Sequence, residues 1–145
     1  MKSYQHILLA AELIPESDTR IIEKAAEFRK LFNARLTAVH VVERISSYGA
    51  AYGVAVGADI EQMLLDNAKE EMIKLAQKLN LPEDDQIIKI GPAGVVILEE
   101  AERMNADLII VGSHGRHGIR LLLGSTANSI LHGAKCDVLA VRLKE

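Results

Sequence analysis

The chain has 145 residues, a formal net charge of −3, and a composition that is 49% hydrophobic but only 3% aromatic. This length fits one domain, which we take to be residues 1–145, with an aliphatic core of its own. The lack of a basic surplus argues against a nucleic-acid partner, and no apolar run is long enough to suggest a membrane partner. The single cysteine, Cys136, rules out a disulfide within the chain. Because the N-terminus lacks a signal-peptide pattern, the sequence predicts a cytoplasmic protein.

The chain begins with an apolar run followed by an amphipathic stretch. Residues 6–11 (HILLAA) predict a buried strand. A loop follows, with Pro15 as the residue that breaks regular structure. Ser17 or Asp18 is expected to be the N-cap of a helix over TRIIEKAAEFRKLF. Asn33 is expected to end this helix.

The next strand is predicted at residues 35–42 (RLTAVHVV), and His40 within it is expected to be a hydrogen-bonded core or edge residue. Residues 43–58 form a loop that is longer than most connections, which favours a functional or interface role. Asp59 is expected to cap the following helix, which Asn80 and Pro82 end. Its apolar stripe consists of Met63, Leu64, Ala68, Met72, Leu75, Ala76 and Leu79.

The second half continues the alternation of strands and helices. The expected elements are a strand at 86–90, a helix over VVILEEAERMN, a strand at 107–111, a helix at 126–133 and a last strand at 137–143. Repeated strand–helix alternation predicts an α/β fold with a parallel sheet and helices on both faces. Ligands of such sheets bind at the carboxyl ends of the strands, where the strand order reverses.

A glycine-rich stretch, VGSHGRHGIRLLLGSTANSI, lies at this kind of position. Gly112 ends a predicted strand, and Gly124 opens a predicted helix whose N–H groups attract phosphate. Hydroxyls follow at Ser125 and Thr126, and Arg116 adds positive charge. Neither a Walker loop nor a dinucleotide fingerprint is present. Spacing therefore leaves two interpretations open, a phosphate cradle and a structural turn.

The whole chain resembles the universal stress protein family. The resemblance rests on GSHGRHGIRLLLGSTANSILHGAKCDVLAVR, with HILLAAEL and LTAVHVV upstream. It implies a Rossmann-like, five-stranded parallel sheet in the order 3-2-1-4-5, and a homodimer. If that order holds, the segment DVLAVRL, whose ends are Asp137 and Leu143, is an edge strand that needs a cover and would form the dimer contact.

The stretch is similar to the motif G-x2-G-x9-G-[ST] of the family's nucleotide-binding branch. Eight residues, instead of nine, separate Gly115 from Gly124. Glu12 stands where binding members usually have Asp near the ribose, and Val41 matches the position whose backbone reads adenine. The candidate nucleotide-binding residues are Ala10, Ala11, Glu12, Val41, Gly112, Ser113, His114, Gly115, Arg116, Gly124, Ser125 and Thr126.

The resemblance thus implies a dimeric stress-response regulator that binds ATP or AMP, with Mg²⁺ as the ion that would accompany the phosphates. We expect no fast catalysis because no general base can be assigned, although slow ATP hydrolysis stays open. The alternative is a nucleotide-free interaction module of the same fold, in which residues 48–57 would bind partners.

Other polar residues fit structural roles better. His114 and His117 lack the further ligands that a metal site needs. His6 belongs to no recognisable cluster, and Cys136 is expected to be a small packed hydrophobe. Five glutamates are expected to lie on solvated helix faces: Glu70, Glu71, Glu99, Glu100 and Glu102.

Overall fold

A computed structural model describes residues 3–43, 57–113 and 124–142, without the side chains of residues 15–17 and 57–58. The predicted alternation of strands and helices is confirmed. In chain order the elements are β1 (His6–Ala10), α1 (Pro15–Phe32), β2 (Arg35–Val42), α3 (Gly57–Leu79), a short 3-10 turn (Glu83–Asp85), β3 (Gln86–Ile90), α4 (Ala93–Arg103), β4 (Leu108–Ser113), α5 (Ser125–Gly133) and β5 (Asp137–Arg142).

The five strands form one sheet in the order β3-β2-β1-β4-β5, and every neighbouring pair is parallel. This confirms the strand order implied by the sequence resemblance. The central strand β1 pairs with β2 through Ala10 and Val39, and with β4 through Ala10 and Val111. β4 extends two residues beyond its predicted end at Val111, so Gly112 and Ser113 still pair with β5.

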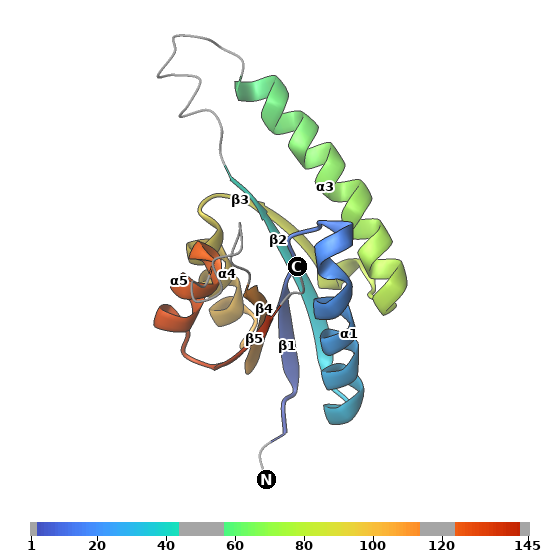
Figure 1. Cartoon of the computed structure of the whole chain (residues 1–145), viewed down its shortest axis with the longest axis vertical. Coiled ribbons are helices and arrows are strands. Elements are labelled where there is room, and N and C mark those ends of the chain that lie inside the picture. Colours follow the sequence, from blue (N-terminus) through green and yellow to red (C-terminus); the bar gives the residue numbers. More distant parts are fainter. Residues whose placement is uncertain (1–2, 44–56, 114–123, 143–145) are drawn as a thin grey trace.

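Helices cover both faces of the sheet. Figure 1 shows α1 and α3 on one face, and α4 and α5 on the other. Successive β1 residues point to opposite faces, as the period of a strand requires. Ile7 and Leu9 therefore pack with the α1 and α3 side, and Leu8 and Ala10 pack with the α4 and α5 side. Both clusters are mainly aliphatic, as the composition predicts.

The start of α1 differs from the prediction. The helix begins at Pro15, with Ile14 as N-cap, so neither Ser17 nor Asp18 is the capping residue. Proline is favoured in the first helical turn because its fixed φ is already helical and its missing N–H would be unpaired there anyway. The C-terminal prediction is confirmed, since Asn33 adopts the left-handed conformation with a φ of 52°.

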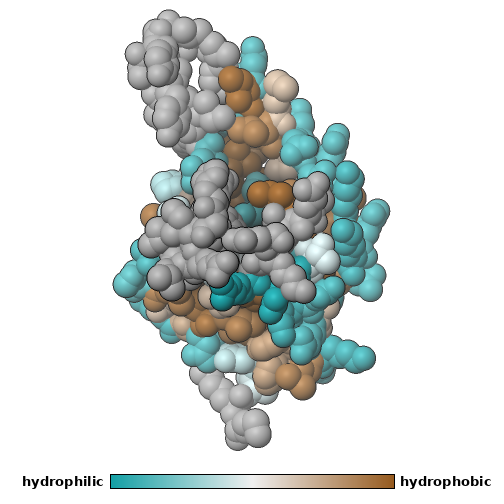
Figure 2. All heavy atoms as spheres, in the orientation of Figure 1, coloured by the Kyte–Doolittle hydropathy of each residue, from teal (hydrophilic) through white to brown (hydrophobic). Residues whose placement is uncertain are grey.

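The first half of α3 differs from the sequence prediction in two ways. The helix begins at Gly57, which places Asp59 within the first turn instead of at the cap. Met63 and Leu64 were expected in the core, yet they are 70% and 39% exposed. Figure 1 shows the reason, because this end of α3 extends past the sheet, and Figure 2 shows apolar surface there. The later residues of the stripe, such as Met72, are buried as predicted.

One carboxylate on α4 also departs from expectation. Glu100 is only 7% exposed, so it does not lie on a solvated face. Its carboxylate accepts hydrogen bonds from Arg103, with Nη2 at 2.8 Å, and this pairing holds the pKa of Glu100 below its usual range. The Arg103 guanidinium, one helical turn later, offsets the free-energy cost of burying the Glu100 charge.

Glycines allow α4 and α5 to pack closely. A Cβ added at Gly94 would lie 2.6 Å from the Cβ of Ser129, and one added at Gly133 would lie 2.6 Å from Cδ1 of Leu98. Both distances are shorter than real contacts between such atoms. Only glycine fits at position 94 at the observed helix separation, because the Cβ of Ser129 is fixed to its backbone, whereas the end of the Leu98 side chain beside Gly133 can move aside. This packing fixes α5, and with it the helix N-terminus that follows Gly124. Among the described helices, none combines the length and hydropathy needed to cross a membrane.

Candidate functional site

The candidate site lies at the carboxyl ends of β1 and β4. From β1 the chain continues to β2 and β3 on one side of the sheet and then returns to β4 on the other side. The helices that follow β1 and β4, α1 and α5, therefore lie on opposite faces of the sheet. Open parallel sheets bind ligands in a crevice at such a switch point, and we refer to this position as the crevice.

The first wall of this crevice is the segment that leaves β1. Ala10 and Ala11 are each 6% exposed, and the N–H of Ala11 donates to the carbonyl of Val39 at 2.9 Å. His40 fixes the same residue from β2, because its Nδ1 lies 2.7 Å from the Ala11 carbonyl and donates to it. His40 is thus hydrogen-bonded as predicted. Val41 follows at the same edge of the sheet, paired with Lys89.

Beyond Ala11 the chain turns sharply. Leu13 has a φ of 61°, a left-handed conformation that side chains other than glycine, asparagine and aspartate rarely adopt. Asp18, one turn into α1, accepts a hydrogen bond from the N–H of Ile14 at 3.1 Å. The carboxylate of Asp18 is 5% exposed, and burial together with the nearby charge of Glu12 raises its pKa to about 6. Sequence analysis missed this role because it considered Asp18 only as a cap.

The second wall comes from β4. Register places Gly112 opposite Val141 and Ser113 opposite Arg142 of β5. The Ser113 hydroxyl lies 3.5 Å from the Val141 carbonyl, at the limit of a hydrogen bond. Because Ala10 pairs with Val111, Gly112 lies near the end of β4, beside the segment that begins at Ala11. Gly112 is buried, and its lack of a side chain is what would let a ligand approach the backbone closely.

The third component is the N-terminus of α5. Gly124 is the N-cap, with φ −60° and ψ 154°, and as a glycine it has no side chain of its own to cap the helix. Ser125 is exposed and Thr126 is half-buried, and both belong to the first turn of the helix. The first N–H groups of a helix have no partner within the helix and carry a partial positive charge. An anion is therefore favoured at this end of α5.

Nine of the predicted site residues thus lie at the carboxyl ends of β1, β2 and β4 or at the start of α5, and we call this side of the sheet the carboxyl edge. His114, Gly115 and Arg116, as well as the metal candidate His117, lie outside the described residues. Within the described ranges, no group of three His, Cys, Asp or Glu side chains could hold a metal ion.

A polar cluster that no sequence pattern indicated lies at the amino ends of the strands, which we call the amino edge. Asp85 is 5% exposed and accepts from Arg35 Nε and from the Thr37 hydroxyl, each at 2.9 Å. Since the hydroxyl proton goes to Asp85, the Thr37 oxygen accepts from Nε2 of His6, at 2.7 Å. Burial lowers the pKa of His6. His6 therefore belongs to a cluster after all, one assembled from β1, β2 and the 3-10 turn before β3, which lie far apart in the sequence.

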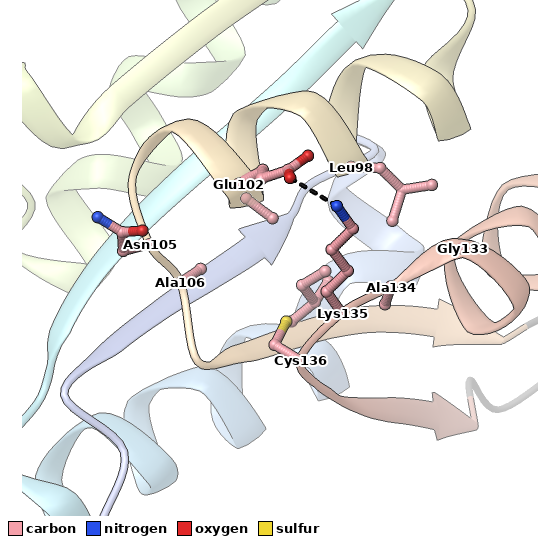
Figure 3. A pocket seen from close by; sticks show the side chains of 10 residues that line it. Leu98, Glu102, Asn105, Ala106, Gly133, Ala134, Lys135 and Cys136 are labelled. Atoms are coloured by element: carbon pink, nitrogen blue, oxygen red, sulfur yellow. Dashed lines mark hydrogen bonds and ion pairs between the residues drawn. The ribbon is translucent and has the colours of Figure 1, made fainter.

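A cavity of about 260 Å³ lies near this same edge, between the ends of α4 and α5. Figure 3 shows the Lys135 ammonium pointing to the Glu102 carboxylate, a 2.8 Å ion pair that spans the opening. Cys136 lines the cavity and packs against the α4 and α5 core, as expected of a small hydrophobe. Burial raises the pKa of the Cys136 thiol, which disfavours the reactive thiolate.

The fold and the crevice define the class first: a doubly wound α/β protein with an anion-attracting helix N-terminus at the switch point. The model of the Universal stress protein family matches residues 3–142, and the chain belongs to this family. The chain is 58% identical over 144 residues to "Universal stress protein A homolog 2" of Coxiella burnetii, and 41% identical over 143 residues to "Universal stress protein A homolog 1" of the same organism. These alignments cover 99% and 98% of this chain and 99% of each relative.

Solved structures share the same fold. Universal stress protein UspA from Lactobacillus plantarum superposes with a TM-score of 0.73 at 25% identity, covering 98% of this chain and 100% of that one. A universal stress protein in complex with cAMP gives a TM-score of 0.64 at 22% identity, with 97% and 98% coverage. The Archaeoglobus fulgidus protein in complex with dAMP gives 0.63 at 20% identity, with 99% and 100% coverage.

Proposed function

We propose that this universal stress protein binds an adenine nucleotide, ATP or AMP, in the crevice between β1 and β4. The observation that carries the proposal is that three segments lie at the carboxyl ends of the strands: the chain after Ala10, Gly112 and Ser113 at the end of β4, and the N-terminus of α5 after Gly124. Two proteins of the same fold are described as complexes with cAMP and dAMP, which supports an adenine nucleotide as the ligand class.

Each segment has a distinct part in this proposal. The backbone near Val41 contacts adenine, and Glu12 contacts the ribose hydroxyls across the extra methylene that distinguishes it from Asp. Gly112 and Ser113 approach the phosphates from β4, while the N–H groups and hydroxyls of Ser125 and Thr126 donate to them from α5. His114, Gly115 and Arg116 remain expected phosphate contacts. Mg²⁺ would be held by the phosphate oxygens of ATP, which suit this hard cation.

We propose that the bound nucleotide sets a conformational or partner-binding state and is not turned over rapidly. Residues 1–145 would act as one domain, in the cytoplasm, and fractionation of cells would check that location.

A homodimer is part of the proposal, because β5 stands at the end of the sheet order and Val138, Leu139 and Ala140 are each half-buried. Light scattering should give twice the 15.9 kDa mass of one chain, whereas a monomer at micromolar concentration contradicts the dimer.

Calorimetric titration with ATP and AMP, with and without Mg²⁺, tests nucleotide binding directly. The decisive variant is Gly124→Asp. The backbone at Gly124 has a negative φ that any residue can adopt, and Asp is among the best N-cap residues. The variant should therefore fold at least as stably as the parent, yet its carboxylate occupies the place of a phosphate and should weaken binding by about 30-fold or more.

Gly124→Asn is the matched control, because it has the size and capping ability of Asp without its charge. It should bind nucleotide within a few-fold of the parent. Equal affinities for the parent and the Asp variant would remove α5 from the phosphate site. No heat at millimolar ATP with Mg²⁺ would instead favour a nucleotide-free interaction module, for which the exposed Met63 on α3 offers an apolar contact surface.

A further inference from the structure

The short connection between β1 and α1 is held in an unfavourable conformation. Leu13 has a φ of 61°, and a residue of this kind persists in that region only when its surroundings impose it. Glu12 precedes Leu13 directly, and Ala11 before it is buried. A group that keeps Leu13 in this conformation therefore also determines the position of Ala11 and Glu12.

Asp18 is the group that holds this connection. The N–H of Ile14 donates to Oδ2 of Asp18 at 3.1 Å, and the N–H of Asp18 donates to the carbonyl of Ile14 at 2.9 Å. The backbone N–H of Leu13 also helps to lower the pKa of the Asp18 carboxylate. Two successive backbone N–H groups thus act on the carboxylate of a residue that is 5% exposed. Hydrogen bonds to an ionised acceptor are about twice as strong as those between neutral groups.

We infer that Asp18 is a positioning residue for the nucleotide site, whose ionised carboxylate holds Leu13 and Ile14 and thereby places Glu12 and Ala11 against the ligand. Protonation of Asp18 removes the charge, weakens both N–H bonds and lowers nucleotide affinity. The inference rests on the proposed function, and it adds a dependence on pH that the binding residues themselves do not require.

The charges around Asp18 determine the pH at which its carboxylate is protonated. Burial and the charge of Glu12 raise its pKa, while the two N–H groups and Lys78 lower it, and the result is about 6. Glu71 and Lys74 of α3 line the same cavity of about 450 Å³ as Asp18 and Lys78. The carboxylate is therefore ionised at pH 7.5 and mostly protonated at pH 5.

His40 is the other titratable group that contacts this segment, through the Ala11 carbonyl. A test must therefore separate the two residues. Asp18→Asn removes the titrating carboxyl while keeping one acceptor oxygen, and His40→Gln keeps a donor to Ala11 while removing the imidazole.

The experiment measures the affinity for cAMP between pH 5 and pH 7.5, because the phosphodiester of cAMP keeps a single charge over this range. The parent protein should lose about fivefold in affinity at pH 5, the equivalent of about one weakened hydrogen bond. Asp18→Asn should bind weakly at both pH values, with no such dependence. His40→Gln should keep the dependence of the parent.

Amide chemical shifts of Leu13 and Ile14, followed by NMR without nucleotide, test the loop independently of binding. They should titrate near pH 6 in the parent and not in Asp18→Asn. If they do so but neither cAMP, AMP nor ATP binds at any pH, the proposed function fails while the assignment of Asp18 to the loop stands. A pH dependence of cAMP affinity that persists in Asp18→Asn, or that disappears in His40→Gln, overturns the inference.

Discussion

At the amino ends of the strands, polar side chains hydrogen-bond to one another, whereas at the carboxyl ends polar groups face the crevice. Asp85, Thr37 and His6 form a closed chain of partners at the first edge. At the second edge Ser125 is exposed beside the first N–H groups of α5. The comparison indicates that the first edge serves stability and the second serves a ligand.

The two buried aspartates sharpen this comparison. Both are 5% exposed, yet they bind different partners. Asp85 meets the guanidinium of Arg35 at 2.8 Å, whereas Asp18 meets backbone N–H groups and the like charge of Glu12. We therefore expect Asp85 to contribute to folding, and Asp18 to reduce stability when it is ionised. A residue that reduces stability at the site edge is consistent with a functional role.

The largest effect is expected from Asp85→Ala. Its removal leaves the buried Thr37 hydroxyl without an acceptor and Arg35 without its carboxylate, which should lower the free energy of unfolding by about 3 kcal/mol. Chemical denaturation measures this change. Asp85→Asn keeps an acceptor for Thr37 and should cost clearly less. Nucleotide affinity should stay unchanged, and a large loss of affinity would contradict the division between the two edges.

A smaller effect is expected from Asp18→Asn, and it depends on pH. The pKa of Asp18 is raised from 3.8 to about 6, so between these values the folded state binds more protons than the unfolded state. The stability of the parent therefore falls relative to the variant as pH rises through this window, by about 2 kcal/mol after allowing for solvent screening. Urea unfolding at pH 4 and pH 7 measures the difference, and a constant gap would show that Asp18 titrates normally.

Next in size is Gly94→Ala. Because the added methyl would lie 2.6 Å from the Cβ of Ser129, α5 must move, and we expect a loss of about 1–2 kcal/mol in stability. Gly133→Ala is the matched control, since its methyl meets only the flexible end of Leu98. Nucleotide affinity should fall in the first variant and not in the second. Equal behaviour of both would mean that the position of α5 does not matter for the site.

The smallest effect is expected from Lys135→Ala. The ion pair with Glu102 is 2.8 Å long, but both side chains are mostly exposed to solvent. Pairs of this kind contribute little because water and salt screen them. Thermal unfolding should be unchanged within error at physiological salt. A clear loss of stability would assign a structural role to the cavity between the ends of α4 and α5, which the geometry does not predict.

The sequence predicted the sheet well because its strands are continuous apolar runs. β2 and β3 match their predicted bounds, and Asn33 ends α1 as expected. The start of α1 was wrong because proline was interpreted as a breaker and not as a first helical residue. Met63 was assigned to the core since periodicity gives the face of a helix but not how far the sheet beneath it extends.

For the candidate site, the sequence by itself placed Gly112 at a strand end and Gly124 at a helix start. Strand ends and helix starts can be located from local patterns, and parallel topology brings them to one edge. Only the tertiary structure decided the partners of Asp18, His40 and Asp85. Their hydrogen bonds join segments whose separation and angle depend on how the helices pack on the sheet. No local pattern contains that information, because burial and pKa arise from neighbours that the fold brings together.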